Sequence, residues 1–198
     1  KLEDLGASIT VMTKEQMADF AMLDINDVFL YAANTEGTGT YTAQTVNRNG
    51  DVQEDVSFNP TQATRVRGIA PANTSFGNTE TMGRTPVDPL NVDAIEISRG
   101  PNASVFGLGN PSGTVNMVPS SANVSRDRTQ LGLRYDNWGG YRASLDFNRV
   151  IKKGVLAIRG SGSFQHDAGS LQPAGVNNIR YNAMVKYQPF KNTTITGS

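Results

Sequence analysis

The chain of 198 residues contains no cysteine and only one histidine, His166. Without cysteine there is no disulfide framework, no thiol nucleophile, and no thiolate ligand for a zinc ribbon or an iron–sulfur cluster. A single histidine is too few for a metal site built from imidazole ligands. The sequence therefore predicts neither a metal nor a cofactor.

The chain also has no net charge. The chain carries 18 Lys and Arg against 18 Asp and Glu, which gives a formal net charge of +0. No overall electrostatic field then attracts nucleic acid or an acidic surface. We expect no nucleic-acid partner.

Long apolar runs are also absent. No run approaches the roughly 18 to 20 residues of a transmembrane helix, which excludes a helical membrane protein. A hydrophobic fraction of 37% and a mean hydropathy of -0.38 are usual for soluble proteins. They also suit a transmembrane β-barrel, in which lipid-facing apolar residues alternate with lumen-facing polar ones. Composition leaves both classes open.

Two short helices are expected near the start of the chain, after an alternating strand over residues 8–12. Thr13 and Gln16 have the spacing of a capping box, so a helix should begin at Thr13. Asp24 is a second candidate N-cap. Apolar residues follow both caps at helical spacing and should pack in a core, namely Met17, Phe20 and Ala21 after the first cap and Ile25, Val28 and Phe29 after the second.

The stretch over residues 34–78 is rich in Gly, Thr, Asn and Gln, and its one convincing strand pattern covers residues 64–69. Loops longer than about 12 to 15 residues are usually binding loops or disordered segments. Both interpretations apply to residues 38–62 and 70–91.

Residues 93–118 join an alternating strand, a glycine-rich loop and a second apolar segment. Glu96 and Arg99 lie three positions apart in the strand, so they point to opposite faces and should have different partners. Arg67, just before Gly68, has a similar setting. A charge in a strand of Val and Ile is expected to be paired or to face a wet interior. The alternative is a simply exposed strand face.

The glycine-rich loop over residues 107–113 fits no phosphate-binding motif. No Lys-Ser or Lys-Thr pair follows the last glycine, as a Walker loop requires, and the spacing is one residue too long for the dinucleotide fingerprint. We interpret Gly107, Gly109 and Gly113 as structural residues that permit positive φ or close approach of neighbouring backbone.

No catalytic constellation emerges from the remaining residues. The chain lacks a Gly-x-Ser-x-Gly elbow, and its only histidine begins an expected polar loop over residues 166–178. The acidic residues over 51–55 are more simply a solvated face than a metal site. The pair His166-Asp167 is more simply part of a loop tip than a proton-transfer pair. The sequence predicts no enzyme.

After residue 123 the chain changes to long segments in which apolar and polar residues alternate. From Leu131 to Tyr135, for example, the odd positions are apolar, and these side chains all point to one face. Four such segments and the start of a fifth are joined by tight turns, which predicts an antiparallel meander. Strands of this kind suit a membrane barrel with a wet lumen, whereas a soluble barrel turns its apolar face inward.

Several of these residues also occur in a recurring order: Arg67-Gly68, then Ala94-Ile95-Glu96-Ile97-Ser98-Arg99-Gly100-Pro101, Phe106-Gly107, Gly113 and Val115-Asn116. This order resembles the plug-domain signature of TonB-dependent outer-membrane receptors. Residues 8–16 resemble the opening of that plug. Residues 134–143 and 188–194 are similar to the first barrel strands that follow it.

The resemblance implies an α+β plug domain, with a small mixed sheet and short helices, over residues 1–123. Antiparallel strands of a transmembrane β-barrel would follow over residues 124–198. The implied function is import of a scarce large nutrient, most often a ferric siderophore, across the outer membrane of a Gram-negative bacterium. The implied partners are outer-membrane lipid, the small-molecule substrate, and an energised TonB-type protein that pulls on the plug from the periplasm.

The resemblance also implies roles for individual residues. A latch between plug and barrel wall would include Glu96, Gly100, Pro101 and two arginines, Arg67 and Arg99, which would pair with wall carboxylates. Gly68 joins Gly107, Gly109 and Gly113 as structural glycines. Four residues in the expected loops would face the substrate, namely Tyr41, Asn73, Phe76 and Asn78.

Some features depart from the family pattern. Family plugs carry an apolar strand ending in Asp-Gly between the two arginine motifs, and residues 73–89 show no such pattern. No TonB-box peptide is found upstream of Leu5. Four strands and the start of a fifth are also too few to close a plugged barrel of about 22 strands.

Two alternatives remain at this point. A soluble periplasmic or secreted β-rich domain could bind a ligand with the loops over residues 38–62 and 70–91. The same membrane fold could import glycans or cobalamin in place of a siderophore. Continuation of the gene with many more alternating segments would favour an importer over a soluble domain.

Overall fold

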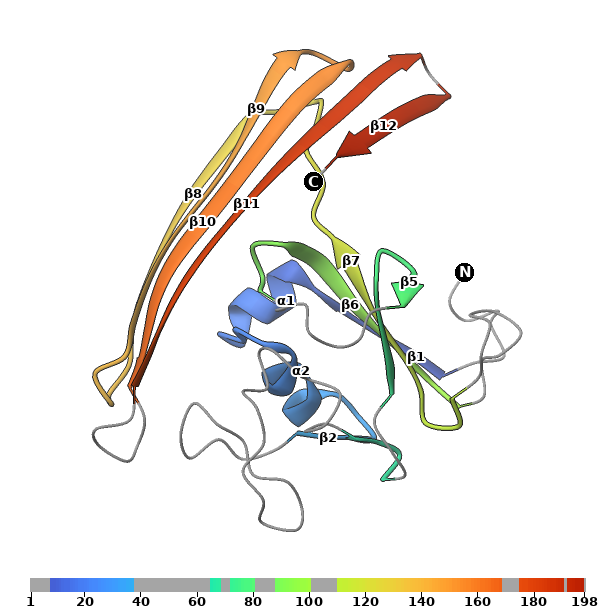
Figure 1. Ribbon diagram of the computed structural model, residues 1–198, viewed down its shortest axis with the longest axis vertical. Coiled ribbons are helices and arrows are strands. Elements are labelled where there is room, and N and C mark those ends of the chain that lie inside the picture. The colour runs from blue at the N-terminus through green and yellow to red at the C-terminus, as the bar shows by residue number, and fades with distance from the viewer. Residues whose placement is uncertain are drawn as a thin grey trace. The chain divides into compact units, whose positions relative to one another are not determined.

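The computed structural model describes residues 8–37, 65–68, 72–80, 88–100, 110–168, 175–190 and 192–197. The chain divides into two compact units, Lys1–Pro119 and Ser120–Ser198, and each has its own sheet (Figure 1). The first unit is α+β, and the second consists of antiparallel strands. This agrees with the fold class expected from the sequence.

The main sheet of the first unit has five strands in the order β1-β6-β7-β4-β5. Strands β4 and β7 are parallel, and the other neighbours are antiparallel. The sheet is therefore mixed, as predicted. Its strands are β1 (Ser8–Thr13), β4 (Asn73–Phe76), β5 (Thr79–Glu80), β6 (Val92–Arg99) and β7 (Gly113–Pro119).

Helices α1 (Lys14–Asp19) and α2 (Ile25–Tyr31) begin where the capping residues predict. The Thr13 side chain accepts a hydrogen bond from Gln16 N at 3.3 Å, and Thr13 N donates to Gln16 Oε1 at 3.0 Å, so both halves of the capping box are present. Asp24 Oδ1 accepts from Asp27 N at 2.9 Å at the start of α2.

The core of the first unit lies between the two helices and one face of the sheet. The predicted helix residues Met17, Ile25, Val28 and Phe29 are buried, and they pack with residues of the strands, including Ile95, Ile97, Val115 and Met117. Phe20 is an exception, because it follows the end of α1 and stays 54% exposed, with its ring 5.3 Å from that of Tyr31. Ala21, the next residue, is also exposed and has a φ of 53°. The prediction that Phe20 and Ala21 belong to the core was wrong.

The polar part of the first unit is more ordered than the sequence indicates. The strand expected over residues 64–69 is reduced to β3 (Arg65–Val66), paired with β2 (Thr35–Glu36), because Arg67 and Gly68 turn the backbone to positive φ values of 59° and 68°. Strands β4 and β5 lie within residues 73–89, where no strand was expected. Strand β4 has mostly polar side chains, so its sequence shows no hydrophobic alternation, although it pairs with the buried strand β7.

The second unit is a single sheet of five strands in the order β12-β11-β10-β9-β8, with every neighbouring pair antiparallel. This confirms the predicted meander of four strands and the start of a fifth. The loop predicted over residues 166–178 is shorter, because His166 and Asp167 pair in register with Asn177 and Val176. The strands are β8 (Arg128–Tyr135), β9 (Tyr141–Lys152), β10 (Leu156–Ala168), β11 (Gly175–Phe190) and β12 (Thr193–Gly197).

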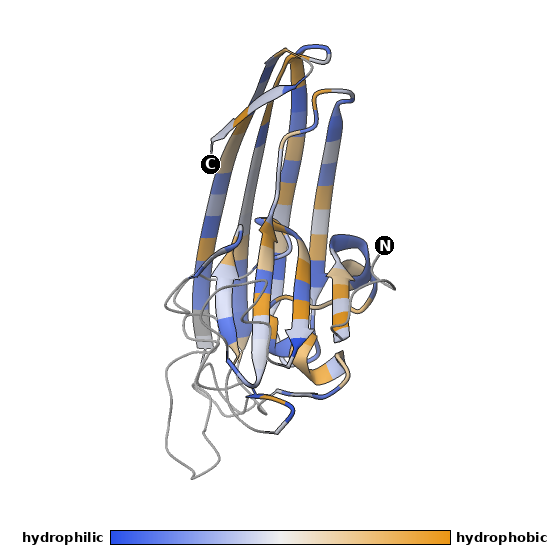
Figure 2. Cartoon of the chain, turned by 90° about the vertical axis from the view of Figure 1, so that its right-hand side faces the viewer, coloured by the Kyte–Doolittle hydropathy of each residue, from blue (hydrophilic) through white to orange (hydrophobic). Residues whose placement is uncertain are grey.

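The two faces of this sheet differ in polarity, and the strands alternate between hydrophilic and hydrophobic residues along their length (Figure 2). Large apolar side chains are exposed on one face, for example Leu133 at 78% and Tyr181 at 90%. On the other face, polar side chains of β9 and β10 are buried, including Arg142, Asp146 and Ser163, whereas β8 is exposed. This is the reverse of the pattern of a soluble barrel, and it matches strands that face lipid on one side.

Candidate functional site

Arg99 is a buried cation at the end of strand β6. It is 8% exposed and its Nη1 donates to Thr10 Oγ1 at 2.8 Å and to Ser8 Oγ at 3.5 Å, both on β1. Its Nε and Nη2 are buried and have no hydrogen-bond partner among the described residues. Burial lowers the pKa of the Arg99 guanidinium, but arginine stays ionised at physiological pH. Two buried nitrogens of a charged group, with three N–H donors in total, therefore have no acceptor among the described residues.

Glu96 lies on the opposite face of β6 and uses different partners, as predicted. Its Oε2 accepts from Asn116 Nδ2 at 2.9 Å. The Oδ1 of Asn116 accepts from Ser75 Oγ and from Asn78 N, both at 3.0 Å. These bonds form a polar row across β6, β7 and β4, so the carboxylate of Glu96 is used within the sheet of the first unit.

Arg67 reaches the same end of the sheet as Arg99, but it follows the end of β3 and is exposed, as in the alternative interpretation of the sequence. Its backbone N donates to Asn34 O at 2.9 Å. Its Nη1 lies 3.6 Å from the position that a Cβ on Gly100 would occupy. Gly100 directly follows Arg99 and has a φ of 96°. The structure thus brings the two predicted latch arginines toward one end of β6, although they are far apart in sequence.

The start of β7 depends on a glycine at position 113. Gly113 has a φ of 118°, and a Cβ there would lie 2.0 Å from Ser98 O on the neighbouring strand. Any side chain would collide with fixed backbone, so the structural role predicted for Gly113 has a steric reason. Four other predicted site residues lie outside the described residues, namely Tyr41, Pro101, Gly107 and Gly109.

Three residues expected in substrate-facing loops belong to or border the sheet. Asn73 lies on β4 and its Oδ1 accepts from Asn110 Nδ2 at 2.9 Å. Phe76, also on β4, packs against the core. Asn78 lies in the turn to β5 with a φ of 65°, and its N–H is bound by Asn116. The loop assignment was wrong for Asn73 and Phe76, because strand pairing with β7 orders them.

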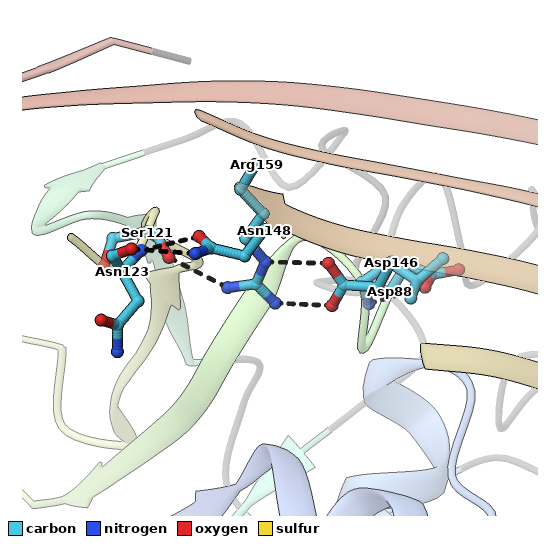
Figure 3. A network of polar contacts seen from close by, with 7 residues as sticks. Asp88, Ser121, Asn123, Asp146, Asn148 and Arg159 are labelled. Carbon is cyan, nitrogen blue, oxygen red and sulfur yellow. Dashed lines mark hydrogen bonds and ion pairs between the residues drawn. The ribbon is translucent and has the colours of Figure 1, made fainter. Parts of the chain in front are cut away.

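In the second unit, side chains of the polar face hold the segment over residues 120–127, which we call the linker (Figure 3). Asn148 Oδ1 accepts from Asn123 N, and its Nδ2 donates to Asn123 O and Arg126 O, all at 2.8 Å. Arg159 forms a bidentate ion pair with Asp146 at 2.8 and 3.0 Å and donates from Nη1 to Ser121 O at 3.1 Å. Asn148 and Arg159 therefore form a linker clamp.

Two further hydrogen bonds fix the linker to strand β9 and the turn after it. Asp127 Oδ1 accepts from Val150 N at 2.7 Å, and Val124 O accepts from Gly154 N at 2.9 Å. Sequence reasoning missed the linker clamp, although it placed Asn148 and Arg159 on the polar face of their strands. Only the strand register shows that these two residues are direct cross-strand neighbours.

His166 and Asp167 do not act as a pair. Asp167 accepts from Gln165 Nε2 at 2.6 Å, and Gln165 Oε1 accepts from Arg142 Nη1 at 2.5 Å. His166 Nδ1 instead lies 2.6 Å from Asn177 Oδ1, and its ring is 5.3 Å from that of Tyr141. Neighbouring residues on a strand point to opposite faces, which separates the two groups.

No three or more His, Asp or Glu residues in the described ranges are grouped so that they could hold a metal ion. No helix among the same residues is long and apolar enough to cross a membrane.

Comparison with known proteins gives a family match over much of the chain. The family model described as TonB-dependent Receptor Plug Domain matches residues 1–114. The ferripyoverdine receptor of Pseudomonas aeruginosa is 28% identical over 140 residues, which cover 70% of this chain and 16% of that receptor. The metal-pseudopaline receptor CntO of the same species is 36% identical over 73 residues, which cover 36% of this chain and 10% of the receptor.

Solved structures match nearly the whole chain. The receptor FpvA of P. aeruginosa, bound to a heterologous pyoverdine, gives a TM-score of 0.79 at 18% identity and covers 98% of this chain and 24% of that one. The alcaligin outer-membrane receptor FauA from Bordetella pertussis gives a TM-score of 0.75 at 20% identity, covering 98% of this chain and 31% of that one. These likenesses show the fold. The chain thus spans about a quarter to a third of the solved receptors.

Proposed function

The chain belongs to the TonB-dependent receptor plug domain family, and from this premise we propose that it is part of a receptor that imports a nutrient across the outer membrane of a Gram-negative bacterium. In this proposal the plug covers residues 1–123 and the first barrel strands cover residues 124–198. The linker over residues 120–127 spans that boundary. No catalytic step is part of the function.

The observation that carries the proposal is the polarity of the second sheet. Its large apolar side chains are exposed on one face. The other face carries polar and charged side chains, and those of β9 and β10 include buried ones. Lipid on the outside and a filled lumen on the inside favour this arrangement, whereas water on the apolar face would disfavour it. An adjoining plug-family unit supports a gated importer over an open pore.

We propose that Arg67 and Arg99 latch the plug to carboxylates of the barrel wall. The buried Nε and Nη2 of Arg99 support this role, because they have no acceptor among the described residues. Gly100 and Pro101 would position this end of β6. Glu96 was also predicted in the latch, but its bond to Asn116 favours a role inside the plug sheet. A desolvated bond from Arg99 would be strong in place and could be exchanged for water when a TonB-type partner pulls. Arg67 is exposed, so its bond would be weaker.

We propose an iron or other metal chelate as the substrate, a ferric siderophore foremost. The support comes from the relatives, which include a ferripyoverdine receptor and a metal-pseudopaline receptor. Glycans and cobalamin are the competing substrate classes.

Uptake by the full-length receptor tests the proposal. The gene is expressed in a Gram-negative strain that lacks its own siderophore receptors, and uptake of radioactive iron is measured with ferric pyoverdine and ferric alcaligin. Labelled cobalamin and an oligosaccharide serve as competing substrates. We expect uptake of a metal chelate that stops when TonB is deleted. A gene that ends soon after this region and gives a soluble, monomeric product would overturn the proposal.

A further inference from the structure

The exposed apolar face of the second sheet ends in two different borders. At one border, cross-strand pairing aligns Tyr135, Tyr141, His166 and Asn177 in one row. At the other border lies the hairpin between β9 and β10, which carries Arg149, Lys152 and Lys153. We call these three residues the basic border.

The separation of the two borders fits the apolar height of an outer-membrane barrel. His166 and Leu156 lie on the same face of β10 and are 166 − 156 = 10 residues apart. At about 3.3 Å per residue, and with a strand tilt of about 40°, this length gives about 25 Å along the membrane normal. Both borders then lie at the level of lipid headgroups.

Turn length indicates which leaflet the basic border faces. Strands β9 and β10 are joined through residues 153–155, and β11 and β12 through residues 191–192. At the opposite end the connections are longer, over residues 136–140 and 169–174. Short turns are typical of the periplasmic side of outer-membrane barrels. The basic border therefore belongs to the periplasmic leaflet.

A β-bulge places one cation of this border on the lipid-facing side. Lys152 pairs with Leu156 and Val150 pairs with Ala157, so Ile151 is an extra residue in β9. Without it, Lys152 would alternate onto the polar face. With it, Lys152 lies opposite Leu156, on the face that also carries Arg149 opposite Ile158.

The cations of the basic border are available for an external anion. Within the described parts of the chain, the side chains of Arg149, Lys152 and Lys153 form no hydrogen bond or ion pair. Asp127, a carboxylate at this end of β9, accepts from the backbone N–H of Val150 instead. Next to the cations, Ile151 is 60% exposed.

We propose that the basic border binds the headgroup phosphate of an anionic phospholipid in the periplasmic leaflet, with the acyl chains against Ile151 and Ile158. An anionic amphiphile matches both parts of this surface, because its phosphate pairs with the cations and its acyl chains cover the apolar side chains. Free phosphate would leave those apolar side chains in water. The inference rests on the membrane location in the proposed function and adds a specific lipid ligand. Lys and Arg at the membrane surface attract anionic lipid and extend toward its headgroups.

The test uses the full-length receptor in vesicles that contain spin-labelled phosphatidylglycerol or phosphatidylcholine. The measured quantity is the ratio of the two lipid association constants. The test variant is Arg149→Gln with Lys152→Gln. The matched control is Arg128→Gln with Lys186→Gln, which removes the same charge from the other face of the sheet. A heat-dependent shift in gel mobility verifies that each variant has inserted as a barrel.

We expect the test variant to lose preference for phosphatidylglycerol by up to about fivefold for each charge removed, and high salt to reduce the preference of the unmodified receptor. The control should keep the full preference. An unchanged preference in the test variant, or equal losses in both variants, would overturn the proposal. If the double variant fails to insert, Lys152→Gln alone should show part of the loss, and no loss there overturns it too. Uptake is measured separately, so the two proposals can fail independently.

Discussion

A buried arginine is costly unless its N–H groups find acceptors, and Arg99 meets this condition only in part within the described residues. Thr10 and Ser8 bind one nitrogen, and two remain. Arg67 reaches the same end of the strand, next to Gly100. Two cations at one end of a sheet repel each other. In the proposed latch, carboxylates from outside the plug would pair with both of them.

We predict that Arg99→Ala loosens the plug in the full-length receptor. Loss of one partner from a buried ion pair costs about 3 to 5 kcal/mol, so hydrogen exchange in β1 and β6 should become much faster. Thr10→Ala is the matched control, because it removes the closer of the two acceptors on β1 and leaves the proposed wall contacts intact. Equal effects of the two variants, or unchanged exchange together with normal uptake in Arg99→Ala, would contradict the latch.

Gly113 supports a second prediction at the residue scale. A residue other than glycine in a strained backbone conformation costs about 1 to 3 kcal/mol. Gly113→Ala should destabilise the pairing of β6 and β7 by more than this, because the new Cβ would also overlap Ser98 O. Gly139→Ala separates the two causes, since Gly139 has a φ of 94° with nothing within 4 Å of the added Cβ. Hydrogen exchange in the strands next to each site is the measurement. A Gly113→Ala effect no larger than that of Gly139→Ala would exclude a steric role.

At the scale of elements, the linker is a short segment without regular structure that is held by side chains of two strands. Asn148 binds backbone groups of Asn123 and Arg126, and Arg159 binds Ser121. These contacts belong to the second unit alone, so they do not depend on the sheet of the first unit. A force applied near the start of the chain would therefore be resisted by the linker contacts before it acted on the strands.

We predict that Asn148→Ala frees the linker while the sheet stays intact. Each lost hydrogen bond contributes about 1 kcal/mol, so exchange of the Asn123 amide should speed up by about tenfold or more. Asn182→Ala is the control. It also removes an asparagine side chain from the polar face of the sheet, but from β11 and away from the linker. Slow exchange of the Asn123 amide in Asn148→Ala would show that other contacts hold the linker.

At the scale of the whole molecule, the exposed apolar face decides between a membrane protein and a soluble one. Leu145 lies in the middle of this face, in register with Leu131 and Gly162. Tyr135 lies at its border, opposite Tyr141. The cost of a charge on a lipid-facing strand depends on depth, so these two positions should respond differently.

We predict that Leu145→Arg lowers the stability of the full-length receptor in lipid vesicles by about 2 to 4 kcal/mol, and that Tyr135→Arg lowers it by about 0 to 1 kcal/mol. Urea unfolding from the vesicles gives both values. In a soluble domain the exposed Leu145 would tolerate arginine, and the solubility of the protein would rise. Equal stability of the two variants would therefore favour the soluble alternative.

The sequence by itself determined the elements whose signals are local. Thr13 and Asp24 fixed both helix starts, because a capping side chain bonds to backbone within its own turn. Alternation predicted β6 and the long strands of the second unit, since a side-chain period of two needs no knowledge of the partner strand. The ordered set of residues from Arg67 to Asn116 indicated the family, which the family model over residues 1–114 confirms.

Only the tertiary structure decided the features that depend on pairing between distant segments. Strand β4 was missed because its polar residues Asn73 and Ser75 are satisfied by Asn110 and Asn116, which lie about forty residues further along the chain. The linker clamp and the bulge at Ile151 depend on strand register, which the pattern of a single strand does not contain. Contacts within one turn are encoded locally, whereas bonds across strands exist only after the chain has folded.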